Sequence, residues 1–157
     1  MTLIIQPAHH IPATKVKNWK EIKAEAEAVD KFVSEGEYHG YWKECFAIHH
    51  AQVSETPKDF FVINRKCKEV LKDMGSWCII NPRIIHESFP IYFPEGCMSF
   101  PFRKPKQVEC FDKITVEYYT LSMGFFLRKR IKDLVGLSAI IMQHEILHGK
   151  GENIYNL

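Results

Sequence analysis

The last apolar segment of the chain most constrains its fold, because it contains two histidines four positions apart. The segment runs from Leu134 to His148, is predicted to be a helix, and ends in His144-Glu145-Ile146-Leu147-His148. Residues four apart lie one turn apart on the same helix face, so both imidazoles can reach one metal ion. Burying unpaired imidazoles costs free energy. An apolar helix that carries two of them therefore predicts a metal site inside the fold.

A metal site needs at least a third protein ligand, and the sequence places it upstream of this helix. Six residues after His148 stands Ile154, which excludes the three-histidine arrangement of metzincin proteases. Only nine residues follow His148, too few for a glutamate ligand on a further helix. The best upstream candidate is Cys97, because the preceding Gly96 lets the backbone approach an ion closely. The other cysteines are expected to be small buried hydrophobes: Cys45, Cys67, Cys78 and Cys110.

Length and composition indicate one globular domain over residues 1–157. The chain is 46% hydrophobic and 25% charged, which excludes disordered and collagen-like proteins. The net charge of +2 and the scattered basic residues give no sign of nucleic-acid binding. No apolar run approaches the roughly 20 residues that span a bilayer. Five cysteines, an odd number, favour a reducing compartment, and no targeting signal opens the chain, so we expect a cytoplasmic location.

The spacing of apolar residues predicts an α+β fold with a helix first, strands in the middle and the apolar helix last. Apolar side chains at steps of three and four follow Asn18, a candidate N-cap, and extend to Val33. We expect strands at residues 60–63, 77–80, 108–121 and 125–131, the last two paired as a hairpin. Asn81-Pro82 is expected to end the second strand, because proline cannot continue a ladder.

Three segments together resemble the peptide deformylase family. Glu95-Gly96-Cys97-Met98-Ser99 is similar to its EGCLS motif, residues 144–148 to its HExxH motif, and residues 79–84 to its INPxI segment. They occur in the family's order and spacing, and the resemblance covers residues 44–151. It implies antiparallel strands packed around a central HExxH helix. The chain resembles a short form, since nine residues after His148 leave no room for the ribosome-docking C-terminal helix of many bacterial members.

Residues 45–52 are the weakest part of the resemblance. Gln52 matches the glutamine of the family's GxGxAAxQ motif, but both glycines are replaced. His49 and His50 stand where the family has paired alanines, and we expect them to pack in the core or lie at the surface. Cys110 stands where an arginine is frequent, so the sequence leaves the partner of Glu95 open.

The resemblance implies hydrolysis of the formyl group from the N-terminal formylmethionine of newly made proteins, with release of formate. One divalent ion would be held by three residues already singled out, Cys97, His144 and His148. Fe²⁺ is the expected native ion, with Zn²⁺ or another divalent ion able to replace it. Glu145 would be the general base, and the Gln52 side chain and the Met98 backbone N–H would stabilise the oxyanion.

A methionine side chain needs an apolar pocket, and helix geometry supplies part of one on the face of His144. The expected substrate-binding residues are Phe46, Ala47, Phe93, Gly96, Leu137, Ile140 and Ile141. Plain core packing is the alternative for each.

Two other interpretations stay open at this point. One is a zinc-dependent HExxH peptidase. The other is an inactive or structural metal-binding relative, with His86 or a second cysteine as fourth ligand. For the deformylase interpretation, the expected partners are N-formylmethionyl nascent peptides, with weak ribosome association, no direct nucleic-acid contact and no membrane contact. The expected location is then the cytoplasm, or the host cytoplasm if the source is viral.

Overall fold

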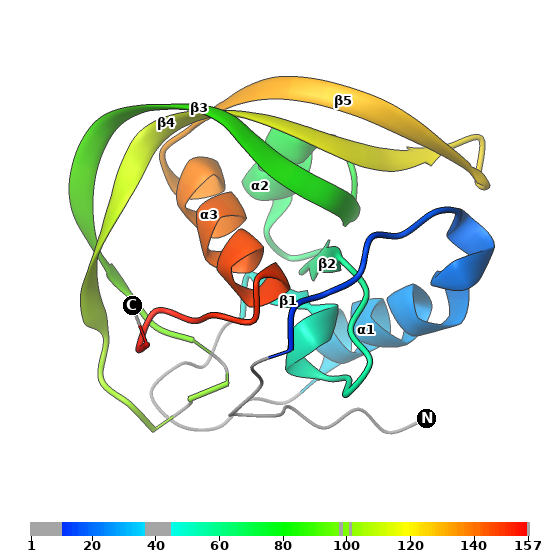
Figure 1. Ribbon diagram of the computed structural model, residues 1–157, viewed down its shortest axis with the longest axis horizontal. Helices are drawn as coiled ribbons and strands as arrows, with labels where there is room; N and C mark the ends of the chain where they lie inside the picture. Colours follow the sequence, from blue (N-terminus) through cyan, green and yellow to red (C-terminus); the bar gives the residue numbers. More distant parts are fainter. Residues whose placement is uncertain (1–10, 37–44, 98, 101, 157) are drawn as a thin grey trace.

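The computed structural model describes residues 11–36, 45–97, 99–100 and 102–156 (Figure 1). The helices are α1 (Lys23–Glu35), α2 (Lys68–Met74) and α3 (Leu137–Gly149), with short 3₁₀ helices η1 (Trp19–Glu21) and η2 (His50–Gln52). The strands are β1 (Ala47–His49), β2 (Phe60–Ile63), β3 (Cys78–Glu95), β4 (Lys106–Ser122) and β5 (Phe126–Val135).

The strands form one antiparallel sheet in the order β1-β2-β3-β4-β5. The helix α3 lies on the concave side of this sheet. Figure 1 shows β3, β4 and β5 arching over α3, with α1 on the far side of β1 and β2. The predicted α+β class and central helix are confirmed. No helix in the described part of the chain is long and apolar enough to cross a membrane.

Strand β2 is buried on both faces, which explains why it reads as a continuous apolar run. Phe61 and Ile63 face the cluster around α3, whereas Phe60 and Val62 face the cluster around α1. The predicted apolar stripe of the first helical segment packs in the α1 cluster as Trp19, Ile22, Ala26, Val29 and Val33. β1 and β2 are thereby fixed between two helices.

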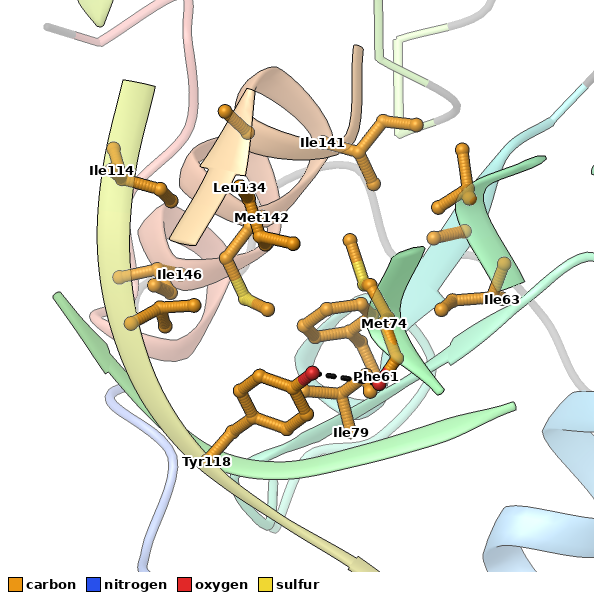
Figure 2. Close-up of a cluster of buried hydrophobic side chains, with 14 residues drawn as sticks. Phe61, Ile63, Met74, Ile79, Ile114, Tyr118, Leu134, Ile141, Met142 and Ile146 are labelled. Atoms are coloured by element: carbon orange, nitrogen blue, oxygen red, sulfur yellow. Dashed lines mark hydrogen bonds between the residues drawn. The ribbon is translucent and has the colours of Figure 1, made fainter. Parts of the chain in front are cut away.

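The cluster around α3 anchors the helix that carries both motif histidines (Figure 2). Met142 is fully buried and Ile146 nearly so, and each such side chain stabilises the fold by about 1.5–3 kcal/mol. At the other end of the cluster, the Tyr118 hydroxyl donates to the Met74 carbonyl at 2.6 Å, and burial raises the pKa of Tyr118 to about 12. Packing around α3 therefore limits how far its histidines can move.

The expectation that Asn81-Pro82 ends a strand is wrong, because β3 continues to Glu95. The pairing register of β3 with β4 shifts between Ile80 and Arg83, so Pro82 passes through an irregularity rather than a regular ladder. Asn81 adopts a φ of 51° there, and its side chain bonds both backbone groups of Val16. Proline thus marks a bend inside the longest strand.

Both predicted helix starts are shifted. Asn18 accepts the backbone N–H of Glu21, but it caps η1, and α1 begins only at Lys23. Leu134 belongs to β5 rather than to the last helix, because Gly136 turns the chain at a φ of 65° that favours glycine.

Candidate metal centre and catalytic site

Three side chains, from α3 and from the residues just after β3, converge in the interior of the molecule. Cys97, just after β3, places its Sγ 3.3 Å from His148 Nε2 on α3. His148 Nε2 lies 3.2 Å from His144 Nε2, and the three donor atoms lie within 4.8 Å of one another. Donors on one tetrahedral ion lie about 3.3–3.6 Å apart, given bonds of about 2.0–2.3 Å. The three predicted ligands therefore come together with spacings that suit one metal ion.

A carboxylate behind His144 fixes the orientation of its ring. Glu95 Oε1 lies 2.9 Å from His144 Nδ1, so the Nδ1 proton is directed to Glu95 and Nε2 is the nitrogen left for an ion. Burial lowers the pKa of His144, but the contacts with Cys97 and Glu95 outweigh it and raise that pKa well above 6.5. The surroundings thus favour positive charge, as a cation site requires.

The partner of Glu95, which the sequence left open, is His144. Cys110, which stands where the family often has arginine, is buried at 5% exposure. Burial, with the negative charges of Glu95 and Asp112, raises the pKa of its thiol to about 11. Cys110 therefore stays an uncharged neighbour, and Glu95 makes its charged contact with the helix.

Glu145 lies on α3 between the two histidines and is 3% exposed. Its Oε2 is the buried side-chain atom in the described residues that lacks a hydrogen-bond partner. Burial raises the pKa of this carboxyl group, helped by the negative charge of Glu95 and opposed by His144 and His49. A buried carboxylate with a raised pKa and an unpartnered oxygen accepts a proton more readily than an exposed glutamate does.

Gln52 lines the opposite wall of the site at 1% exposure. Its Oε1 accepts the backbone N–H of His49 at 2.9 Å. Its Nε2 therefore points into the site, where it donates to Ser99 Oγ at 3.1 Å and lies 3.9 Å from Cys97 Sγ. Met98, the other predicted oxyanion donor, lies outside the described residues.

An apolar cavity of about 260 Å³ opens beside these groups. Its walls include all seven residues predicted for the substrate pocket, namely Phe46, Ala47, Phe93, Gly96, Leu137, Ile140 and Ile141. The same cavity is also lined by Gln52, His144 and Glu145, so the polar groups of the site lie at the edge of one apolar cavity. The structure brings together predicted residues from β1, β3 and α3.

The candidates for a fourth protein ligand lie outside the ligand cluster, although Cys45 lines the same cavity. His86 is exposed on β3, and its Nε2 faces Ser88 Oγ at 3.2 Å. None of the five cysteines forms a disulfide, and only Cys97 belongs to the metal-ligand cluster found among the described residues. Cys45, Cys78 and Cys110 are buried as expected, whereas Cys67 is only partly buried. Three ligands rather than four favour an ion with an open position.

Sequence reasoning missed Asp59 and the contact of Ser99 with Gln52. His49 and His50 are buried, at 0% and 6% exposure, as the packing interpretation expects. His49 also contacts Asp59, with Nε2 3.0 Å from Oδ1. Asp59 lies just before β2 and belongs to no recognisable motif, so no local signal could have found this pair.

A family model described as Polypeptide deformylase matches residues 4–156. The chain belongs to the polypeptide deformylase family. A peptide deformylase of Helicobacter acinonychis (strain Sheeba) is 37% identical over 73 residues, 46% of this chain and 39% of that protein. One of Macrococcus caseolyticus (strain JCSC5402) is 41% identical over 81 residues, 50% of this chain and 42% of that protein. The chain thus matches less than half the length of these curated deformylases.

Solved deformylase structures share the fold over nearly the whole chain. The enzyme from Thermotoga maritima is 22% identical, with a TM-score of 0.75 over 99% of this chain and 97% of that one. The deformylase of the Vibrio parahaemolyticus bacteriophage VP16T, solved with actinonin, is 25% identical, with a TM-score of 0.69 over 98% and 100%. These deformylase structures support the arrangement of the sheet around α3.

Proposed function

We propose that this chain is a metal-dependent peptide deformylase that hydrolyses the formyl group from N-terminal formylmethionine. The observation that carries the proposal is the meeting of three metal-ligand side chains with Glu145 and Gln52 at one apolar cavity. A site with three ligands, a buried base and a facing hydrogen-bond donor has the parts that amide hydrolysis needs.

The family is metal-dependent, and Cys97, His144 and His148 fit one divalent ion. When bound, such an ion supplies a Lewis acid that polarises a carbonyl and makes water nucleophilic at neutral pH. One thiolate and two imidazoles suit both Fe²⁺ and Zn²⁺. We propose Fe²⁺ as the native ion, with Zn²⁺ or another divalent ion able to replace it.

Glu145 and Gln52 have separate roles in the proposed reaction, proton transfer and stabilisation of the oxyanion. Glu145 takes a proton from the attacking water and passes it to the departing nitrogen as the C–N bond breaks. Gln52 Nε2 donates to the formyl oxygen as negative charge develops on it. The Met98 backbone N–H is proposed as a second donor. The water oxygen ends in formate, and the peptide keeps a free α-amino group.

The shape and polarity of the cavity indicate the class of substrate. Its apolar walls suit the flexible, unbranched side chain of methionine. Because the reacting groups lie at the polar side of the chamber, a formylmethionyl chain seated there would present its formyl carbon to them. We propose nascent formylated peptides as substrates and the cytoplasm as the location, in line with five cysteines that form no disulfide. Weak ribosome association is a further proposal, tested by co-sedimentation with ribosomes.

Formate release from formyl-Met-Ala-Ser by the anaerobic, Fe²⁺-loaded chain tests the proposed function. We expect formate and free Met-Ala-Ser in equal amounts, and no cleavage of an unformylated peptide. Internal peptide cleavage without formate would instead identify a peptidase. A chain that binds one metal ion per molecule and releases nothing would be an inactive or structural relative.

A further inference from the structure

A buried histidine paired with a partly buried carboxylate lies directly behind Gln52. His49 is fully buried, and its Nε2 lies 3.0 Å from Asp59 Oδ1. The other ring nitrogen, Nδ1, accepts the backbone N–H of Ala51 at 3.0 Å. Since Nδ1 is an acceptor, the ring proton is on Nε2 and is donated to Asp59. Both ring nitrogens are therefore used, and the ring has one orientation.

His49 and Gln52 close η2 from both ends. The His49 side chain caps the turn by accepting Ala51 N–H, and the His49 backbone N–H is accepted by Gln52 Oε1 at 2.9 Å. An amide whose oxygen is bound in this way must present its NH₂ group on the opposite side. For Gln52 that side is the metal-ligand cluster, with Nε2 3.1 Å from Ser99 Oγ. The orientation of the proposed oxyanion donor thus depends on the geometry of the turn.

The last turn of α3 is shaped to receive the pair. A Cβ atom on Gly149 would lie 2.8 Å from Asp59 Oδ1 and 3.1 Å from His49 Nε2. Gly149 stands four residues after Glu145, on the same helix face. Figure 1 shows β1 beside this end of α3, with which it makes contacts. One close-packed contact therefore sets the spacing between the turn of Gln52 and the helix of Glu145.

We propose that His49 is a positioning residue for deformylation, which holds the Gln52 carboxamide toward the formyl oxygen, and that Asp59 holds His49. This inference rests on the proposed function of the site. An alanine at position 49 has no side-chain acceptor for Ala51 N–H and no contact with Asp59. In this chain the turn is therefore fixed by side-chain bonds that the family's paired alanines cannot make.

His50 supplies a matched control, because it shares the turn and the burial but not the contact with Gln52. Its ring stacks on Phe60 with centroids 4.7 Å apart, and its Nδ1 accepts the Lys58 backbone N–H at 3.0 Å. It points to the α1 side of the sheet, since Phe60 belongs to that cluster. Replacing His50 should affect folding without turning the Gln52 carboxamide.

Steady-state kinetics of Zn²⁺- or Fe²⁺-loaded His49→Ala, His49→Asn and His50→Ala test the proposal at pH 8. We expect His49→Ala to lower kcat about tenfold with KM changed less than about threefold, as for a partly misaligned oxyanion donor. Asparagine caps helical turns well, so His49→Asn should recover most of kcat. His50→Ala should keep kcat within about twofold. Full kcat in His49→Ala, or an equal loss in His50→Ala, would overturn the proposal.

A double-mutant cycle separates positioning from general damage. In a Gln52→Ala background, His49→Ala should lower kcat by less than about twofold, because the group it positions is gone. A tenfold loss in both backgrounds would show that His49 acts independently of Gln52 and would contradict the proposal.

A readout that needs no turnover keeps this test distinct from the test of the proposed function. The side-chain amide resonances of Gln52 in the Zn²⁺-loaded protein are assigned by their loss in Gln52→Ala. We expect them to shift and exchange faster in His49→Ala and to stay in place in His50→Ala. Unchanged resonances in His49→Ala would refute the proposal. A parent protein that releases no formate would refute only the function.

Discussion

The two sides of the site match the family very differently, yet the structure brings them to the same cavity. The ligand side, which comprises Cys97, His144 and His148, carries the family's residues in each position. The turn side, residues 45–52, keeps only Gln52 of the motif residues and replaces both glycines and both alanines. Gln52 nevertheless lines the cavity together with His144.

The difference follows from what each side must supply. A metal ion needs thiolate and imidazole lone pairs, and only cysteine and histidine provide them. The turn has only to present one carboxamide, which different sets of hydrogen bonds can achieve. In this chain His49 and Asp59 supply those bonds, with Gly149 leaving room for them. We therefore expect substitutions of the metal ligands to abolish metal binding, and substitutions in the turn to change only the position of the Gln52 carboxamide.

The largest expected effect is on the ligand side. Cys97→Ala should lose stoichiometric metal and at least about 10³-fold in formate release, because two imidazoles alone hold a divalent ion weakly. Elemental analysis after desalting and a formate assay measure both. Cys67→Ala, a partly buried thiol outside the cluster, is the control and should keep one ion per chain. Metal retained by Cys97→Ala would place the third ligand elsewhere.

Removing the turn side's donor should cost activity but not metal. Gln52→Ala should lower kcat about 10²- to 10³-fold, the usual loss for one oxyanion-hole donor, while metal content stays at the parent level. Formate release with elemental analysis separates the two effects. If kcat stayed within about threefold of the parent, Gln52 would have no role as an oxyanion donor.

Protonation of the buried His50 should lower the free energy of unfolding in acid. It should not affect formate release at pH 8. Burial lowers the pKa of His50 to about 4. Because the folded pKa lies below the ordinary value of 6.5, its contribution is present above pH 6.5 and is lost as pH falls toward 4. The loss amounts to about 3 kcal/mol. Urea unfolding of the parent and His50→Gln should show a smaller decrease in the variant, and equal slopes would contradict the assignment.

The smallest expected effect concerns the contact between the turn and α3. Gly149→Ala places a methyl group against Asp59 and His49, and one of them must move. We expect a decrease of about 1–2 kcal/mol in the free energy of unfolding and a severalfold lower kcat. Lys150→Ala, at the neighbouring position, should change neither. A Gly149→Ala variant as stable and active as the parent would show that the contact sets no spacing.

The fold was predictable where one pattern dominates a whole element. The hairpin of β4 and β5 follows from alternation and a short turn, and α3 follows from its apolar face. Asn81-Pro82 misled because proline usually ends a strand, whereas here the register shift is stabilised by Asn81 bonding to Val16, 65 residues away. Local propensity cannot anticipate such a distant contact.

Part of the site was also predictable from the sequence, and part was not. Cys97, His144 and His148 were predictable because metal chemistry restricts both residue type and spacing. The partner of Glu95 was not, because it depends on how Cys110 and His144 pack around the carboxylate. The His49–Asp59 pair joins the last residue of β1 to the residue just before β2, and no motif indicates this contact. Only the folded chain reveals it.

Glu145→Gln, loaded with the same metal as the parent, tests the central claim most directly. We predict one ion per chain in both proteins and formate release at least about 10³-fold slower in the variant. Burial raises the pKa of Glu145, so keeping it charged costs stability as pH rises above 4.5. With the metal removed from both proteins, the variant should therefore also be more stable at pH 8 than the parent. Formate release within about tenfold of the parent would contradict the assignment of Glu145 as the base.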